Sequence, residues 1–221
     1  MRKALLSTVV LLGAPLLWAS AANATLISIG LQESGVNGGL VTPVANDGGI
    51  GVVTFAGTYG TFTVNTVTGT GSPILPEPLL LTNSVNVSSS TAGNLFVYVT
   101  EQGLTSPQGV NNFLSTLTNN LTTGKVSVLL GTLISPTNVK FGEPVLAPMT
   151  AVASLKTASS VNASPDLSGP FSETAVYEIM ATGAGTSNTT IDIAAVPEPF
   201  TLAVLGVGLA GLGLIRRRPA R

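Results

Sequence analysis

Histidine and cysteine, which most often carry catalysis and metal binding, are both absent from the 221 residues. Without imidazole there is no base for a Ser–His–Asp or Cys–His device, and the commonest transition-metal ligand is missing. Without thiols there are no disulfides, no Cys-ligated zinc and no iron–sulfur cluster. Any chemistry must therefore come from carboxylates, hydroxyls and lysines.

Paired carboxylates can hydrolyse glycosidic bonds without histidine. Nine of the ten acidic residues lie between the two chain ends, but none falls in a recognisable catalytic motif. Glu173 and Glu178 are five residues apart, so on one strand they point to opposite faces. We interpret the nine acids as solvated surface carboxylates. We expect no catalytic residue and no enzyme activity, and a carboxylate-only hydrolase is the least favoured alternative.

Two smaller arrangements could also do chemistry. Ser154 and Lys156 share a face of an expected strand, but they lack the Ser-x-x-Lys spacing of a known nucleophile pair. Asp47, in a glycine-rich turn, could bind Ca²⁺, yet one carboxylate supplies too few ligands for a strong site. We assign Lys156 to solubility and Asp47 to turn formation, and we predict no metal and no cofactor.

The N-terminus has the three parts of a secretory signal peptide. Arg2 and Lys3 form the basic region, an uncharged apolar run follows to Trp18, and Ala22 and Ala24 provide a small-x-small cleavage site. We therefore predict that residues 1–24 are removed and that the mature chain begins at Thr25. An uncleaved anchor is the alternative, although the run is short for a membrane span.

The C-terminus carries a second hydrophobic segment. An uncharged run fills residues 200–215, directly after Pro197-Glu198-Pro199 and directly before Arg216, Arg217 and Arg218. As a helix the run measures about 24 Å, close to the thickness of a bilayer core. The arginines then stay on the cytoplasmic side. The glycines of this run spell G-x-G-x-x-G, but the chain ends too soon for a dinucleotide site.

Together these features resemble the PEP-CTERM sorting signal of exported Gram-negative proteins. The matching parts are the motif at 197–199, the transmembrane helix at 200–215 and the basic tail at 216–221, within a signal at 196–221. The resemblance implies processing by an exosortase, transient anchoring in the inner membrane, and release or attachment at the cell surface. It also implies a link to exopolysaccharide and biofilm. A plain, unprocessed anchor is the alternative. The internal copy at Pro76-Glu77-Pro78 lacks a following span, so we predict a loop before a strand.

Residues 25–195 remain as one domain, with nine acidic residues and three lysines, a net charge of −6. That balance gives no reason to expect a nucleic-acid partner. The phrases at 101–105, 112–115 and 169–177 resemble the secreted domain of PEP-CTERM proteins, which implies a β-rich fold and no assigned activity.

Short alternating runs at 27–31, 62–66, 95–100, 125–130, 175–180 and 190–193 predict β-strands. Turn residues separate them, including Thr123-Gly124 and Gly183-Ala184-Gly185. We therefore predict an all-β domain, a single β-sandwich. Residues 107–122 are ambiguous, because Phe113, Leu117 and Leu121 have helical spacing while Thr and Asn disfavour a helix. A short helix there stays open.

The expected surface is rich in Thr, Ser, Asn and Gly and poor in charge. Hydroxyls and amides suit contact with polysaccharide or with another surface protein. The sequence thus favours an exported, non-enzymatic surface or matrix protein, with a carbohydrate-binding or adhesive module as the alternative. No tryptophan lies in the mature domain to sharpen the sugar hypothesis.

Overall fold

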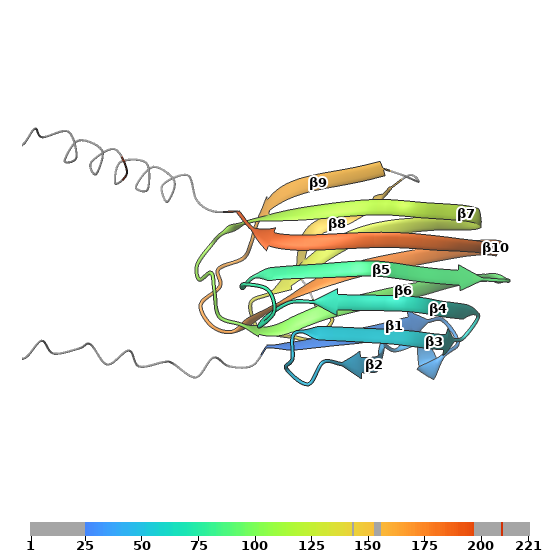
Figure 1. Cartoon of the computed structure of the whole chain (residues 1–221), viewed down its shortest axis with the longest axis horizontal. Coiled ribbons are helices and arrows are strands. Elements are labelled where there is room, and N and C mark those ends of the chain that lie inside the picture. The colour runs from blue at the N-terminus through green and yellow to red at the C-terminus, as the bar shows by residue number, and fades with distance from the viewer. Residues whose placement is uncertain (1–24, 143, 153–155, 197–208, 210–221) are drawn as a thin grey trace, which may run out of the picture.

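The computed structural model describes residues 25–142, 144–152, 156–196 and 209. Within them the chain forms ten β-strands and one short 3-10 turn (Figure 1). The all-β fold class predicted from the sequence is confirmed for these residues, and none of their helices is long and apolar enough to cross a bilayer. The elements are β1 (Leu26–Glu33), η1 (Asn37–Gly39), β2 (Thr42–Asn46), β3 (Val52–Tyr59), β4 (Phe62–Thr70), β5 (Leu79–Ser89), β6 (Ala92–Leu104), β7 (Asn112–Ser135), β8 (Val145–Ala151), β9 (Lys156–Ala163) and β10 (Phe171–Ala195).

The strands join into one antiparallel sheet in the order β2-β1-β6-β10-β5-β4-β3, with β7 paired to β10, β8 and β9. β7 and β10 pair with each other along both of their halves. The first half of β10 also pairs with β6, and its second half pairs with β5. Likewise, β9 pairs with the first half of β7 and β8 with the second. The two long strands therefore belong to two layers, which lie one behind the other in Figure 1.

The long strands change layer at glycines. The register between β7 and β10 shifts between Ala181 and Gly185, beside Gly124. Gly124 has φ of 70°, in the left-handed region that favours glycine, and a Cβ there would lie 2.3 Å from the carbonyl oxygen of Ala184. The prediction of strand-ending turns at these glycines is wrong, because the chain bends here without leaving its ladder.

The two layers pack on one hydrophobic core. Every second residue of β1 points into it, and Ile27, Ile29 and Leu31 are fully buried. A Cβ on Gly69 of β4 would lie 2.6 Å from Cγ1 of Val99 on β6 and 3.2 Å from Cγ2 of Ile27. Strands of opposite layers thus approach closely enough to need a glycine. The other layer contributes Phe62, Val64, Val67, Val85, Val87, Ile191 and Ile193.

The helix left open at 107–122 does not form. β7 begins at Asn112, and its side chains alternate, with Phe113, Ser115, Leu117 and Asn119 buried. Leu121, which the helical spacing assigned to the buried face, is exposed. Thr and Asn are poor helix formers, and pairing on both edges, with β9 and β10, buries alternate side chains of the segment, which favours the strand.

Both ends of the described chain lie at the same end of the layers (Figure 1). Thr25 precedes β1, is 2% exposed, and donates its hydroxyl to the carbonyl oxygen of Ser72 at 2.6 Å. Val196 follows β10 and donates its backbone N–H to the carbonyl oxygen of Asn112 at 2.7 Å. The described domain therefore begins and ends at the same end of the layers.

Candidate functional site

Most of the residues that the sequence singled out for processing lie outside the described part of the chain. These are Ala22 and Ala24 of the cleavage site and Pro197, Glu198, Pro199, Arg216, Arg217 and Arg218 of the sorting signal. Thr25 is described, and its anchored side chain marks the start of the domain. The internal copy of the tripeptide forms the predicted loop, and β5 begins directly after it at Leu79.

Asp47 serves the turn in which it lies. Its Oδ1 accepts hydrogen bonds from the backbone N–H groups of Ile27, at 2.9 Å, and Gly49, at 3.0 Å, and its Oδ2 accepts one from Gly51 at 2.7 Å. The carboxylate thereby ties the loop after β2 to the start of β1. Among the described residues no group of three or more His, Cys, Asp or Glu side chains could hold a metal ion. The geometry favours the turn interpretation over the calcium alternative.

The structure gives no support for a nucleophile pair of Ser154 and Lys156 among the residues that it describes. Ser154 lies outside the described residues. Lys156 begins β9 on the exposed surface, opposite Asn119 of β7.

The prediction that all acids are solvated is wrong for four of them: Glu33, Asp47, Glu101 and Glu173 are buried. Glu33 has partners, because Thr61 donates its backbone N–H and its hydroxyl to the carboxylate, the latter at 2.6 Å. Sequence spacing could not reveal this, since the partners are 28 residues apart. Glu33 thereby fixes the turn between β3 and β4 to the end of β1.

Glu101 and Glu173 form an unusual buried pair. They are direct partners across β6 and β10, and neither has exposed surface. The backbone N–H of Ser72 donates to Oε1 of Glu101 at 2.8 Å, while both oxygens of Glu173 lack a partner among the described residues. Burial raises the pKa of Glu101 to about 7, and burial together with repulsion from Glu101 raises the pKa of Glu173 well above its ordinary value.

This carboxylate pair does not have the setting of a glycosidase site. Such a site needs both groups in a cleft where a sugar ring can lie between them. Glu101 and Glu173 face the interior and have no accessible surface.

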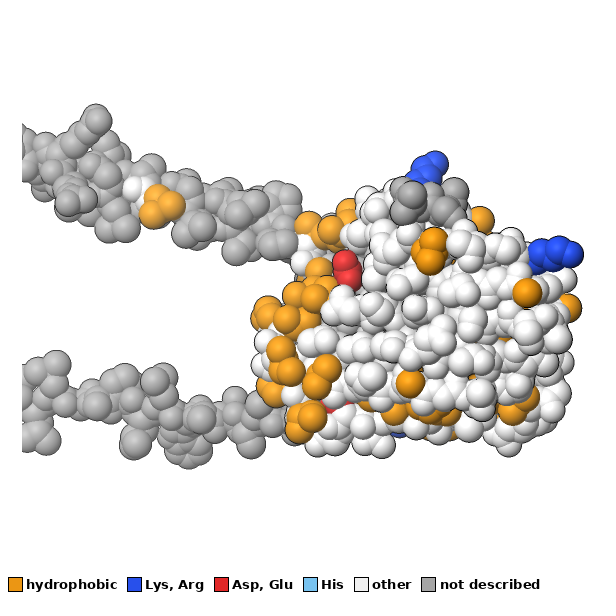
Figure 2. Space-filling model, turned by 45° about the vertical axis from the view of Figure 1, so that its right-hand side comes forward, with side chains coloured by type: hydrophobic (Ala, Val, Ile, Leu, Met, Phe, Trp, Pro, Cys, Tyr) orange, Lys and Arg blue, Asp and Glu red, His pale blue; other side chains and the backbone are white. Residues whose placement is uncertain are grey.

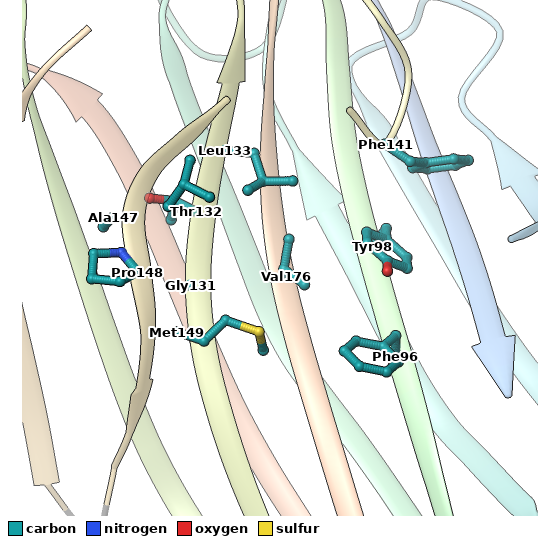
Figure 3. Close-up of a pocket in the computed structure, with 11 residues that line it drawn as sticks. Phe96, Tyr98, Gly131, Thr132, Leu133, Phe141, Ala147, Pro148, Met149 and Val176 are labelled. Atoms are coloured by element: carbon teal, nitrogen blue, oxygen red, sulfur yellow. The ribbon is translucent and has the colours of Figure 1, made fainter. Parts of the chain in front are cut away.

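A groove of about 370 Å³ lies on the outer face of the layer that contains β6 and β8 (Figure 3). One wall is aromatic. Phe96 and Tyr98, two residues apart on β6, lie with ring centroids 6.3 Å apart and planes inclined by 20°. The ring centroid of Phe141 lies 5.7 Å from that of Tyr98, and the two ring planes are inclined by 50°. Residues of β7, β8 and β10 form the floor and the opposite wall: Gly131, Thr132, Leu133, Val145, Ala147, Pro148, Met149 and Val176.

The backbone is shaped to bring the third ring into place. Phe141 has φ of 58°, a left-handed conformation that is strained for an aromatic residue. Its loop is tied to β6, because the Gly103 N–H donates to Oδ1 of Asn138 at 2.8 Å and Gln102 donates to the Asn138 carbonyl at 2.9 Å. Gly30 on β1 leaves room for the ring, since a Cβ there would lie 2.7 Å from Cζ of Phe141.

Polar side chains continue the groove beyond Phe96. A second, smaller hollow adjoins it and is lined by Gln32, Ser34, Gly39, Asn94 and Phe96. Asn94 donates to Oε1 of Glu178 at 2.7 Å, and the Tyr98 hydroxyl donates to Oε1 of Gln32 at 2.8 Å. Burial and the Glu178 charge raise the pKa of Tyr98, which keeps this hydroxyl protonated. Aromatic faces and amide groups thus lie side by side on one surface.

Sequence reasoning identified β6 as a strand but missed the groove. The available signal was the alternation of Asn94, Phe96 and Tyr98, which predicts that all three side chains share one face. Phe141 and the residues of β8 could not be added, because their position depends on how distant strands pair.

No protein-family model matches the chain, and no curated protein matches it. Among solved structures, TmCBM61, determined in complex with β-1,4-galactotriose, has a TM-score of 0.34 and 9% identity over 63% of this chain and 92% of its own. The enzymatically active domain of bacteriophage CBA120 tailspike protein 4 has a TM-score of 0.33 and 9% identity, over 77% of this chain and 19% of its own. A chain from infectious bursal disease virus, Gx strain, has a TM-score of 0.24 and 10% identity, over 77% of this chain and 56% of its own. Likeness at this level carries no argument about this chain.

Proposed function

We propose that this chain is an exported, non-enzymatic surface or matrix protein that binds a glycan in the aromatic groove, on a β-sandwich domain. The single observation that carries the proposal is the row of three neighbouring rings, Phe96, Tyr98 and Phe141, beside amide side chains on one open face. The apolar C–H face of a pyranose can pack on such rings, while its hydroxyls bond to amides and carboxylates.

The charge distribution supports a neutral or weakly charged glycan. The residues that line the groove carry no charged side chain, and Glu178 beside it accepts a hydrogen bond from Asn94. The nearby cation is Lys140, whose Nζ lies 6.0 Å from the Phe141 ring centroid. Binding would then rest on stacking and hydrogen bonds and depend little on salt.

The non-enzymatic part of the proposal rests on where the carboxylates lie. The two that face each other, Glu101 and Glu173, have no accessible surface, and Glu178 beside the groove is hydrogen-bonded to Asn94. A hydrolase of the two-carboxylate kind needs a second acid within reach of the same substrate.

The export route is a proposal from the sequence. Residues 1–24 direct secretion, and the signal at 196–221 directs exosortase processing, with the partner glycan an exopolysaccharide at the cell surface. The support is the joint occurrence of a signal peptide, Pro197-Glu198-Pro199, an uncharged run and an arginine cluster in one chain.

Glycan binding can be tested with exopolysaccharide purified from the organism that makes the protein, by biolayer interferometry against a serum albumin control. We expect binding by the unaltered protein, and a loss of about tenfold or more in affinity for Phe96→Ala and for Tyr98→Ala. Removing one stacked ring costs about 1.4 kcal/mol when it carries a hot-spot contact, which corresponds to tenfold.

Phe55→Ala is the matched control. Phe55 is a partly buried aromatic residue on β3, in the other layer and away from the groove. It should retain full binding. Equal losses in the three variants would indicate a general effect on folding, and a response no larger than that of albumin would remove the proposal.

A further inference from the structure

Exposed aliphatic side chains gather at the end of the domain where the described chain begins and ends. Figure 2 shows hydrophobic side chains collected there. The most exposed are Ile50, Ile74 and Val110, at 64%, 57% and 60%. Leu114 and Val161, which face each other across β7 and β9 near the same end, are exposed by 36% and 57%. We call these five residues the apolar end surface.

The loops that carry the apolar end surface are bonded into one platform. Ile74 packs directly against Gly51, which leaves room for it because it has no side chain. A Cβ on Gly51 would lie 3.0 Å from Cγ1 of Ile74. The Gly71 N–H donates to the Gly51 carbonyl at 3.0 Å. Glu77 accepts the Thr105 N–H at 2.7 Å, which joins the next loop. The exposed aliphatic groups are thus held on ordered loops. Isolated exposed residues need no explanation, but a gathered patch usually marks a contact surface.

The charges near this surface favour a neutral partner. Lys125 lies beside the bend of β7 at the opposite end of the layers, and Lys156 pairs with Asn119 on that side as well. At the same end of the layers lie the exposed Asp166, Glu77, which accepts hydrogen bonds from Thr105 and Ser106, and Lys140, in the loop that Asn138 ties to β6. Charges of both signs at this end suit a surface that carries no net charge.

The length of chain beyond the domain limits how far this surface can be from the hydrophobic run. Val196 is bonded to Asn112, and only three residues separate it from Phe200, where the run begins. Four Cα–Cα steps span at most about 14 Å even when fully extended. Whatever layer holds residues 200–215 therefore lies next to the end of the domain that carries Ile50, Ile74 and Val110.

We propose that the apolar end surface rests on the outer face of a lipid bilayer, on zwitterionic headgroups, while the C-terminal run is still inserted. This inference rests on the membrane step of the proposed sorting route. Partial burial of aliphatic side chains at the headgroup boundary is a general mode of surface attachment. Docking would hold the domain upright and keep the segment at 197–199 at the membrane surface, while the aromatic groove stays open to the outside.

The absence of cysteine from the sequence makes site-specific labelling straightforward. The full chain, reconstituted into phosphatidylcholine vesicles, is labelled with an environment-sensitive fluorophore after Ile74→Cys or Val110→Cys. Leu121→Cys is the matched control, an exposed aliphatic position on β7 near the bend, at the other end of the domain. Leu209→Cys reports on the C-terminal run. Circular dichroism checks that each variant keeps its strands.

Brominated phosphatidylcholine should quench the labels at 74 and 110 at least twofold and leave the label at 121 unchanged. Quenching at 209 without quenching at 74 and 110 would overturn the docking while leaving membrane insertion intact. No quenching at 74, 110 or 209 would overturn both, and quenching at 74 and 110 alone would support docking without the tail. A blue shift at 74 and 110 that grows with the protein-to-lipid ratio, without quenching by the brominated lipid, would assign the surface to a second copy and overturn the lipid proposal.

Discussion

Buried carboxylates separate into two kinds by what surrounds each one. Asp47 and Glu33 each accept several hydrogen bonds from N–H or O–H groups and tie loops to β1. Glu101 accepts a hydrogen bond from Ser72 at Oε1 only, and neither oxygen of Glu173 has a partner among the described residues, so burial disfavours the charged forms of both. Burial raises the pKa of both carboxyl groups, so the neutral acid forms persist to higher pH than those of exposed glutamates.

This pair predicts that the protein is more stable in mild acid than in mild base. A raised pKa means that the folded state binds more protons than the unfolded state between the ordinary glutamate value and about 7 for Glu101. The free energy of unfolding should therefore fall as the pH rises through this window. A shift of this size corresponds to about 3 kcal/mol for Glu101 alone. Urea denaturation between pH 4.5 and 8.5 measures the change.

Isosteric variants assign the pH dependence to this pair. Glu173→Gln and Glu101→Gln, which cannot ionise, should flatten the profile and raise the stability at pH 8 relative to the unaltered chain. Asp166→Asn is the control, because Asp166 is exposed on a loop. A profile that stays equally steep in both glutamine variants would contradict the assignment.

At the scale of strands, the alternation of apolar and polar residues predicted where strands lie, but it did not predict where one strand ends or which strands pair. The runs at 62–66, 95–100 and 175–180 all lie within observed strands, because period-two burial is a local property. The helical spacing of Leu121 predicted a buried position, but Leu121 is exposed. The segment is a strand because β7 pairs with β9 and β10, which lie far away in the chain. The same limit hid the groove. Phe96 and Tyr98 are visible as neighbours on β6, but Phe141 joins them only through the register of the sheet.

The bend of β7 and β10 carries an element-scale prediction. Gly124→Ala forces a side chain into a left-handed backbone and against the Ala184 carbonyl oxygen. We expect a loss of about 2 kcal/mol or more in the free energy of unfolding, measured by urea denaturation with an unchanged slope.

Gly169→Ala is the control for the bend. Gly169 lies in the loop before β10, and a Cβ there would meet nothing within 4 Å. Its stability should stay within about 0.5 kcal/mol of the unaltered protein. Similar losses in the two variants would show that the bend does not depend on the missing side chain of Gly124.

For the whole molecule, the chain divides into parts of different charge. The net charge of −1 averages an acidic domain at −6 with ends that hold six of the nine basic residues. The domain places its termini and its apolar end surface together and leaves its aromatic groove on the side of a layer. This arrangement allows one end to face a membrane while the groove faces outward. The sorting-signal hypothesis could be made from sequence because it rests on linear motifs, and it stays a prediction, whereas both surfaces exist only after folding.

The two Pro-Glu-Pro copies allow a test of sorting within one chain. We expect the tagged protein to be shorter in a Gram-negative host that has an exosortase than in the same host without it, as measured by immunoblotting. Glu198→Ala should abolish this shortening, since Glu198 lies in the tripeptide that precedes the hydrophobic run. Glu77→Ala should leave it intact, because the internal copy is folded against Thr105 and Ser106 and is followed by β5. Equal size in both hosts would reject exosortase processing. Shortening that Glu198→Ala does not affect would place the cut elsewhere and leave the tail as an ordinary anchor.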